Sequence, residues 1–299
     1  MMASVAAITA RKAAAAYLNF RLVALKRTVK SVTRGRGNRR TAIRIDLTRA
    51  ASPRAIRDSA SVAGIGAVPY NFLNMLNSLE MTGRSRTHID AAAEFGCLLH
   101  PAAYQALREM RAAALTAGID LGVVSAFRDF DRQLLIWNAK FRGERPLLDR
   151  NGIELRRDSL DDSQAIDAIL CWSALPGASR HHWGSDFDVI DRRRIPEGYS
   201  VALVPGEFAA GGIFAPLDRW LETHMRDFGF FRPYRIDRGG VRPEAWHLSF
   251  APVAVPTLED LTLELLREAL EEAAIDGRKQ LLERLPEIYY RYVLGVDGP

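Results

Sequence analysis

Cysteine is nearly absent from this 299-residue sequence: Cys97 and Cys171 lie far apart and fit no C-x-x-C pattern. This excludes the closely spaced cysteines of a structural zinc knot and the paired cysteines of a disulfide framework. Both cysteines have apolar neighbours, so we expect buried free thiols. Histidine is scarce too, with six in the whole chain, so any place where histidines gather is informative.

Acidic residues are absent from residues 1–45, which hold eleven of the 41 lysines and arginines. The other 254 residues carry 30 basic and 36 acidic side chains, so the net charge of +5 comes from this first segment alone. Because no recognised motif accompanies the charge, we expect no nucleic-acid partner. Three interpretations of the segment stay open: a disordered or helical extension, an amphipathic helix that contacts a membrane surface, or a targeting peptide.

Long uncharged runs are absent from residues 1–40, because Arg11, Lys12 and Arg21 interrupt the apolar stretch. The segment therefore lacks the roughly 18 apolar residues of a membrane span and the uninterrupted apolar core of a secretory signal. We expect a cytoplasmic location, with the periplasm or the cell envelope as the alternative.

Residues 88–254 have the apolar periodicity of a folded domain that contains both helices and strands. The expected helices cover residues 100–118, 129–143, 159–172 and 214–229. The expected strands cover residues 119–127, 185–191 and 245–250. Gly118 closes the first helix, Ser159 with Asp162 caps the third, and residues 149–152 form a turn. This mixture of elements predicts an α+β fold.

Residues 255–299 have the pattern of a helical appendage. One amphipathic helix is expected over residues 256–274, started by Thr257, and a second over residues 278–294, which Pro286 breaks or kinks. A weakly ordered linker, with a short helix near residues 70–80, precedes the domain. The predicted division is therefore an extension (1–45), a linker (46–87), a domain (88–254) and the appendage (255–299).

The stretch SRHHWGSDFD, residues 179–188, gathers two of the six histidines and two aspartates. A catalytic zinc takes three ligands from His, Asp or Glu and leaves one position open. His181 and Asp188 are seven residues apart, so on one straight strand they would face opposite sides. If both bind one metal, the chain must turn between them, and Gly184 permits such a turn.

The stretch EAWH, residues 244–247, offers the best candidate for a third ligand. Glu244 and His247 are three residues apart at the entry to an apolar strand. This spacing can bring a carboxylate near a metal-bound water without making it a ligand. We expect the remaining histidines to be structural, namely His88, His100, His224 and His182.

Together with SAFRDFDRQ (125–133), these stretches follow the pattern S-x-x-R, S-x-H-x-x-G-x-x-x-D and E-x-W-H in order and in rough spacing. The chain in this respect resembles the VanY-type D-alanyl-D-alanine carboxypeptidases, which share a superfamily with zinc D,D-dipeptidases and phage L-alanyl-D-glutamate endopeptidases. The resemblance covers about residues 95–252. It implies the VanY/hedgehog-like peptidase fold, a small antiparallel sheet with flanking helices that carries a zinc site.

Carried over residue by residue, the resemblance implies one Zn²⁺ per chain with three protein ligands. The implied ligands are His181, Asp188 and His247. The implied catalytic residues are Glu244 as general base and Arg128 as the arginine that stabilises the oxyanion. The implied substrate-binding residues are Ser125, Gln133, Ser179 and Trp246. Asp186 stands where the family usually has a small residue, and it either orients a metal-binding histidine or lies solvated in the loop.

We therefore expect a bacterial zinc metallopeptidase that removes a C-terminal D-alanine from peptidoglycan stem peptides or muropeptides. The resemblance implies that Glu244 assists the attack of zinc-bound water on a D,D or an L,D bond. Two alternatives stay open: a peptidoglycan endopeptidase of the same superfamily, and a non-catalytic peptidoglycan-binding domain. Retention of Glu244 and Arg128 argues against the second alternative, because binding alone needs no general base.

Overall fold

The computed structural model describes residues 75–299. The expected extension (1–45) and most of the expected linker lie outside the described residues, as does the beginning of the helix expected near residues 70–80. Helix α2 (Ser78–Met81) is the part of that helix within the described range. Asn77 caps it by accepting hydrogen bonds from the backbone amides of Leu79 and Glu80.

A four-stranded antiparallel sheet in the order β3-β6-β8-β7 lies at the centre of the described residues. Its strands are β3 (Leu121–Ser125), β6 (Asp186–Asp191), β8 (His247–Phe250) and β7 (Phe230–Phe231). Two separate hairpins are formed by β1 (Asp90–Ala92) with β2 (Cys97–Leu99) and by β4 (Leu147–Leu148) with β5 (Glu154–Leu155). The second hairpin closes over the turn expected at residues 149–152. Together with the helices, these strands confirm the α+β fold class.

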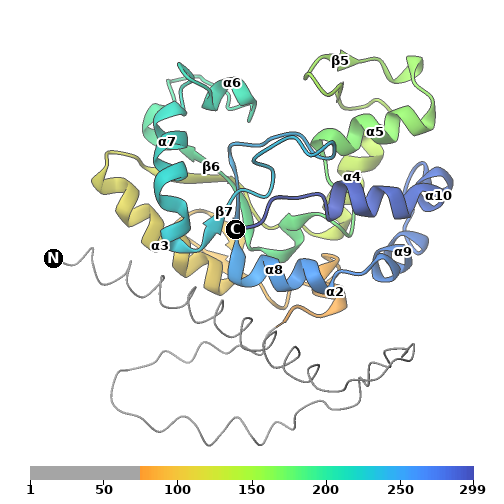
Figure 1. Cartoon of the computed structure of the whole chain (residues 1–299), viewed down its shortest axis with the longest axis horizontal. Coiled ribbons are helices and arrows are strands. Elements are labelled where there is room, and N and C mark those ends of the chain that lie inside the picture. The colour runs from red at the N-terminus through yellow and green to blue at the C-terminus, as the bar shows by residue number, and fades with distance from the viewer. Residues whose placement is uncertain (1–74) are drawn as a thin grey trace, which may run out of the picture. The chain divides into compact units, whose positions relative to one another are not determined.

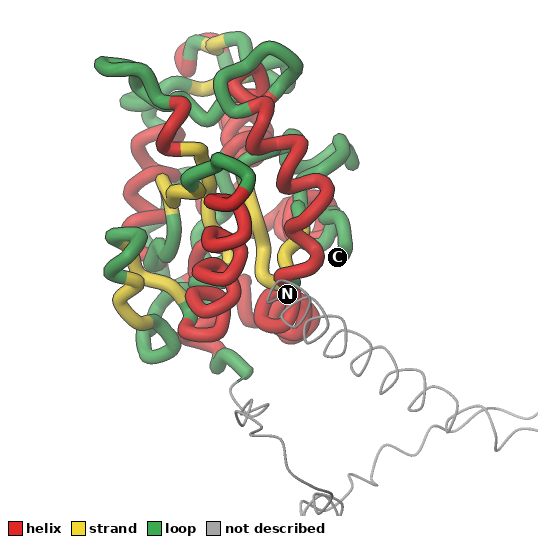
Figure 2. Tube along the Cα trace, turned by 90° about the vertical axis from the view of Figure 1, so that its left-hand side faces the viewer, coloured by secondary structure: helices red, strands yellow, loops and turns green. Residues whose placement is uncertain are grey.

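The helices fall into two groups, which Figure 1 shows on either side of the central strands. One group consists of α3 (Pro101–Thr116), α6 (Pro205–Phe208) and α7 (Ala215–His224). The other consists of α4 (Phe130–Phe141), α5 (Asp162–Trp172), α8 (Ala251–Asp260), α9 (Leu263–Glu271) and α10 (Arg278–Ile288). Figure 2 shows the strands enclosed by helices from a second direction. None of the helices in residues 75–299 is long and apolar enough to cross a membrane.

Alternation along the central strands gives the sheet one apolar and one polar face. Phe187 and Val189 of β6 and Leu248 of β8 are completely buried in the core that α3 and α7 cover. Asp186 and Asp188 alternate with these residues and face the other way, yet they too are buried. Burying carboxylates is costly unless partners compensate their charge, so this polar face is where we look for a site.

A second hydrophobic core lies between α4, α5, α9 and α10. Trp137 of α4, Ile169 of α5, Leu270 of α9 and Leu285 of α10 are all 0% exposed in this core. The indole Nε1 of Trp137 donates a hydrogen bond to the carbonyl oxygen of Asp276 (3.1 Å), in the connection between α9 and α10. The helices after residue 254 thus complete the core around α4. Both cysteines are free thiols as expected, with Cys171 buried and Cys97 half-buried.

The predicted start of α5 is wrong by two residues. Asp161, and not Ser159 with Asp162, caps this helix: its carboxylate accepts from the Gln164 amide (2.8 Å), and Gln164 Oε1 accepts from the Asp161 amide (3.0 Å). Ser159 lies in a preceding 3₁₀ turn and donates its hydroxyl to the carbonyl of Arg156. The expected motif, a capping box, is therefore present, but Asp161 and Gln164 form it two residues later than predicted.

The single helix expected over residues 256–274 is two helices. Helix α8 starts at Ala251, and Thr257 lies inside it with its hydroxyl donating to the carbonyl of Val253 (2.8 Å). Thr262 starts α9, because its Oγ1 accepts a hydrogen bond from the amide of Leu265 (3.1 Å). A threonine N-cap therefore does begin a helix here, but it is the second threonine.

Pro286 does not break α10, which continues to Ile288. A π-helical turn (Tyr289–Val293) follows directly, in which the amide of Leu294 donates to the carbonyl of Tyr289, five residues back (3.0 Å). Proline cannot supply an interior helical hydrogen bond, and the helix widens after it rather than ending at it.

Candidate metal centre

Three strands align the polar residues of the candidate site in one row across the sheet. Asp188 of β6 pairs with His247 of β8 on one side and with Ser125 of β3 on the other. Ser125 reaches this row through an irregularity in β3, because Val123 pairs with Val189 while Ser125 already pairs with Asp188. The bulge turns Ser125 from the apolar to the polar face of the sheet.

His181 comes from the 3₁₀ turn Arg180–Trp183, directly before β6. Gly184 ends this turn in the left-handed conformation, with φ of 63°, and so provides the turn expected between His181 and Asp188. A Cβ atom at Gly184 would lie 2.2 Å from Ile89 Cδ1 and 2.8 Å from the backbone nitrogen of His100. Both the dihedral angle and the close packing therefore require glycine.

His181, Asp188 and His247 offer three ligand atoms that lie within 4.8 Å of one another. His181 Nε2 is 3.7 Å from Asp188 Oδ2, and His247 Nδ1 is 3.2 Å from Asp188 Oδ1. All three residues are buried. Two imidazole nitrogens and one carboxylate oxygen form a ligand set that suits zinc and leaves a fourth position open.

The second nitrogen of each histidine already has a partner, which fixes the nitrogen that faces the cluster. His181 Nδ1 donates to the carbonyl oxygen of Ala126 (2.9 Å), which leaves Nε2 for a metal. His247 Nε2 donates to Asp186 Oδ1 (3.2 Å), which leaves Nδ1. Such hydrogen bonds hold the ring orientation of metal-binding histidines. Within residues 75–299, buried Asp188 Oδ1 receives no hydrogen bond, so a cation there would satisfy it.

Asp186 is completely buried and connects His247 to a buried arginine. Its Oδ1 accepts from Arg180 Nε (2.7 Å), and its Oδ2 accepts from Ser185 Oγ (2.8 Å). Burial opposes its ionisation, but the charge of Arg180 and the hydrogen bond from His247 hold the pKa of Asp186 at about 2. Of the two interpretations of Asp186, the structure supports orientation of His247 over a solvated loop residue.

The protonation of the two histidines differs because their carboxylate partners differ. Burial lowers the pKa of His181 to about 3 against the opposing charge of Asp188. Burial would lower the pKa of His247 as well, but the hydrogen bond to Asp186 and the negative charges of Asp188 and Asp186 outweigh it and raise that pKa to about 10. Without a metal, a proton on His247 thus offsets the buried negative charge. A divalent cation supplies the same compensation when it takes the place of the proton on Nδ1.

Glu244 lies beside the cluster without belonging to it. Its Oε2 is 3.5 Å from His247 Nδ1, and its side chain is 13% exposed. Burial raises the pKa of Glu244 to about 7, although the charges of His247 and Arg128 oppose this. A carboxyl group that titrates near neutrality can both accept and return a proton.

Arg128 contacts two of the residues expected to bind substrate. Its Nη1 donates to Gln133 Oε1 (2.8 Å) and its Nη2 donates to Ser125 Oγ (3.0 Å). Gln133 is completely buried and donates its Nε2 to the carbonyl of Ala174 (2.6 Å). Burial lowers the pKa of Arg128, and the charge of Asp188 opposes that shift. These contacts hold a positive charge at the end of the strand row.

Three further residues of the motifs lie around the cluster. Ser179, directly before the His181 turn, is 1% exposed, and its hydroxyl has no hydrogen-bond partner among the described residues. Trp246 packs in the core with its ring 5.7 Å from that of Phe208, so its part as a pocket wall stays a prediction. His182 donates Nδ1 to the carbonyl of Arg128 (2.6 Å), and its Nε2 accepts the amide of Gly177 (3.1 Å), so both nitrogens are occupied, as expected for a structural histidine.

Sequence reasoning overlooked Tyr234. Its ring lies 5.1 Å from that of His247, the residue is 9% exposed, and burial raises the pKa of its hydroxyl. The carbonyl of Tyr234 accepts the amide of Glu244 (2.9 Å), which fixes the approach of the EAWH stretch. No motif singles out this tyrosine, and only its place ten residues before Glu244 could have drawn attention to it.

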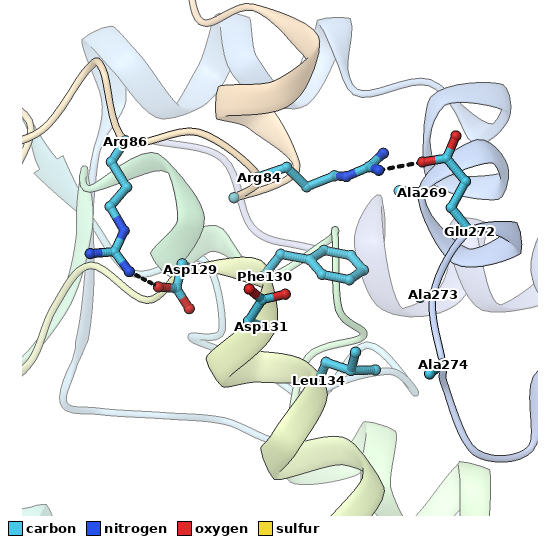
Figure 3. Close-up of a pocket in the computed structure, with 11 residues that line it drawn as sticks. Arg84, Arg86, Asp129, Phe130, Asp131, Leu134, Ala269, Glu272, Ala273 and Ala274 are labelled. Atoms are coloured by element: carbon cyan, nitrogen blue, oxygen red, sulfur yellow. Dashed lines mark hydrogen bonds and ion pairs between the residues drawn. The ribbon is translucent and has the colours of Figure 1, made fainter.

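A separate cavity of about 410 Å³ lies between the start of α4 and the end of α9 (Figure 3). Arg84 pairs with Glu272 across it, and Arg86 pairs with Asp129. None of the candidate ligands lines this cavity, and these charges are already paired. It therefore contributes nothing to the metal centre.

A buried His–Asp–His cluster beside a carboxylate with a near-neutral pKa, in an α+β fold, is an arrangement typical of hydrolases. The family follows from comparison: the chain belongs to the VanY family, whose model, described as D-alanyl-D-alanine carboxypeptidase, matches residues 96–253. The protein is thus a peptidase of the carboxypeptidase class.

Individual relatives match parts of the chain as well. An uncharacterised protein of Haemophilus influenzae is 32% identical over 128 residues, which is 42% of this chain and 95% of that protein. A second Haemophilus influenzae protein is 43% identical over 98 residues, 32% of this chain and 67% of that protein. The solved structure of VanYB in complex with D-alanine-D-alanine superposes with a TM-score of 0.41 at 21% identity, covering 62% of this chain and 88% of that one.

Proposed function

We propose that the protein is a zinc-dependent carboxypeptidase that removes a C-terminal D-alanine from peptidoglycan stem peptides. The observation that carries the proposal is the convergence of His181, Asp188 and His247 next to Glu244, on the polar face of the sheet, in a chain of the VanY family. Neither the D,D nor the L,D bond is preferred by this geometry, so both substrates enter the test.

The ligand set fits a zinc ion in its donors, its burial and its charge. His181 Nε2, His247 Nδ1 and a carboxylate oxygen of Asp188 would hold the ion. When bound, zinc polarises a carbonyl group and makes water a stronger acid. The outer hydrogen bonds to Ala126 and Asp186 keep both imidazoles in place as ligands.

Glu244 acts as the proton carrier of the reaction. Its Oε2 accepts a proton from the attacking water and afterwards gives it to the nitrogen of the departing D-alanine. The near-neutral pKa of about 7 suits both transfers, because the carboxyl group is neither a weak acceptor nor a weak donor at neutral pH. Peptide cleavage thereby yields a new carboxylate and a free amine.

Arg128 stabilises the negative oxygen that develops on the scissile carbonyl. Its hydrogen bonds to Gln133 and Ser125 set the guanidinium in place before substrate binds. A fixed donor of this kind loses little free energy to reorganisation during the reaction. Ser125 and Ser179 remain candidates for hydrogen bonds to the peptide.

The test is an assay of the purified, zinc-loaded protein on muropeptides with tetrapeptide and pentapeptide stems, followed by mass spectrometry. The expected product is D-alanine from at least one stem, with release lost in a chelator and restored by zinc. Absence of D-alanine from both stems under zinc would refute the proposal. Cleavage within intact sacculi, without release of D-alanine, would identify an endopeptidase instead.

Glu244→Gln tests the proton carrier directly. Glutamine keeps the size but cannot accept the proton, so we expect kcat to fall at least about 100-fold while the zinc content stays at one per chain. Zinc content is measured by atomic absorption and kcat by D-alanine release. Glu283→Gln, on the exposed face of α10, is the matched control and should behave as wild type. Retained turnover in Glu244→Gln would remove Glu244 from this role.

A further inference from the structure

Lys140, in the last turn of α4, is a half-buried cation that the mechanism above does not use. The described residues contain only one other lysine, Lys279, which is exposed. Many arginines of the described residues form ion pairs with carboxylates. Lys140, in contrast, forms no ion pair with any carboxylate of residues 75–299. Its one hydrogen bond goes to a neutral hydroxyl, from Nζ to Ser173 Oγ (2.7 Å). A desolvated ammonium group without an anion lacks the partner that usually accompanies such burial.

The position of Lys140 is tied to the candidate site through a continuous set of contacts. Gln133 and Lys140 are seven residues apart on α4, two turns along one face of the helix. Gln133 accepts a hydrogen bond from Arg128 and donates one to the carbonyl of Ala174. Ser173, which directly precedes Ala174, accepts the hydrogen bond from Lys140. The ammonium group thus lies beside the segment that anchors Gln133, the residue that holds Arg128.

Electrostatic interactions also connect Lys140 with the candidate site. Glu244 and Lys140 act on each other: the lysine lowers the pKa of Glu244, and the glutamate raises that of Lys140. Burial and the charge of Arg145 nevertheless bring the pKa of Lys140 down to about 8. The lysine is therefore close enough to the catalytic carboxylate to influence it without pairing with it.

We propose that Lys140 binds the free C-terminal carboxylate of the substrate peptide and so makes the site selective for the last residue of a chain. The inference rests on the proposed function, since a carboxypeptidase must distinguish a terminal carboxylate from a continuing peptide. In any peptide that carboxylate carbon lies one residue, at most about 4 Å, beyond the scissile carbonyl carbon. A cation that is connected to Arg128 through Gln133 and the Ser173–Ala174 segment, but is distinct from Arg128, meets this requirement, because Arg128 is committed to the scissile carbonyl.

The experiment compares synthetic stem tetrapeptides and pentapeptides as free acids and as C-terminal amides. For Lys140→Met we expect kcat/KM on the cleaved free acid to fall about 10- to 100-fold, mostly through KM, because a remote charge contributes equally to ground and transition states. The kcat/KM for the amide should change less than about threefold, since the amide has no terminal negative charge for Lys140 to bind. Lys140→Arg should recover most of the activity, and Lys279→Met should match wild type.

The same comparison is repeated without turnover, by calorimetric titration of Glu244→Gln protein with the free acid and the amide. Selective binding of the acid that disappears in the Glu244→Gln, Lys140→Met double variant would support the role of Lys140 even if wild type released no D-alanine. In that case the proposed hydrolytic activity would be wrong, while the proposed role of Lys140 would stand. Equal losses on acid and amide, or an unchanged kcat/KM for the acid with an unaltered melting temperature, would overturn the inference.

Discussion

At the residue scale, Asp186 determines which nitrogen of His247 faces the ligand cluster. Its carboxylate accepts the Nε2 proton, and Arg180 in turn fixes the carboxylate with a 2.7 Å hydrogen bond. The negative charge also makes the imidazole a better ligand, because it raises the electron density on Nδ1. We therefore expect Asp186 to influence metal affinity without contributing a ligand atom itself.

Asp186→Asn should lower zinc affinity about 10- to 100-fold, the usual effect of losing an outer partner of a metal-binding histidine. The amide oxygen still accepts a hydrogen bond but carries no charge, so the histidine remains oriented and binds less strongly. Competition with a chelating dye measures the affinity. Asp191→Asn, equally buried at the other end of β6, is the control and should leave zinc affinity unchanged. Equal affinities for wild type and Asp186→Asn would contradict the prediction.

A second residue, His100, couples pH to stability. Its Nδ1 caps α3 by accepting the amide of Ala102 (3.2 Å), so the cap requires the neutral imidazole. Burial and the charge of His88 lower the pKa of His100 from 6.5 to about 4. The unfolded chain therefore binds the proton first. We expect the contribution of His100 to stability to be fully present above pH 6.5, to be lost as the pH falls towards 4, and to change no further below that.

His100→Asn removes this titration while keeping an N-cap acceptor. At pH 7.5 we expect the free energies of unfolding of wild type and variant to agree within about 1 kcal/mol. At pH 4.5 the variant should be relatively more stable by about 2 kcal/mol, the linkage of a 2.5-unit shift with some discount for partial exposure. Urea unfolding at both pH values measures the difference. If the difference in free energy of unfolding between wild type and variant did not change with pH, the acid sensitivity would have to come from other groups.

At the scale of elements, residue patterns predict strands and helices better than they predict how those elements pair. The apolar residues Phe187 and Val189 alternate with aspartates, so the strand and its two faces follow from periodicity. The bulge that sets Ser125 opposite Asp188 follows from no pattern in SAF, since it depends on how β3 meets its neighbour. Family resemblance named His181, Asp188 and His247 together. The sheet register explains why Asp188 and His247 meet, and the turn that Gly184 ends explains why His181 joins them.

The loop before EAWH depends on the C-terminal tail. Asp297, 5% exposed, accepts the amides of Arg235 and Ile236 and two hydrogen bonds from the guanidinium of Arg238. Its own amide donates to the carbonyl of Pro233 (2.8 Å). The tail thereby holds the loop that contains Tyr234, whose carbonyl in turn fixes the amide of Glu244.

Asp297→Ala should loosen this loop, because two backbone amides and a guanidinium lose their acceptor at once. We expect trypsin to cut after Arg235 or Arg238 at least about tenfold faster, and kcat to fall about tenfold with zinc content unchanged, since the ligands lie on other elements. Mass spectrometry of the fragments locates the cleavage. Glu283→Ala, exposed on α10, should leave both readouts at the wild-type value. Unchanged trypsin cleavage would show that the tail does not hold the loop.

At the scale of the whole molecule, the helices after residue 254 extend the folded unit beyond the part that matches the family. The family model ends at residue 253, yet α9 and α10 bury leucines against α4 and α5. An amphipathic pattern predicts that one face of a helix is covered but not which surface covers it. This is why the packing of residues 255–299 could not be predicted from the sequence, although their helical character could.

Helix α4 carries Gln133 and Lys140, so the core beneath it should support the site as well as the fold. Leu285 of α10 is 0% exposed in that core. Leu285→Ala should lower the free energy of unfolding by about 2–5 kcal/mol, because a buried leucine leaves both lost transfer energy and a cavity. Leu294→Ala, 37% exposed, is the control and should cost less than about 1 kcal/mol. Urea unfolding followed by tryptophan fluorescence measures both. A small loss for Leu285→Ala would mean that α10 packs on the domain without stabilising it, and truncation after residue 255 would then leave a folded protein.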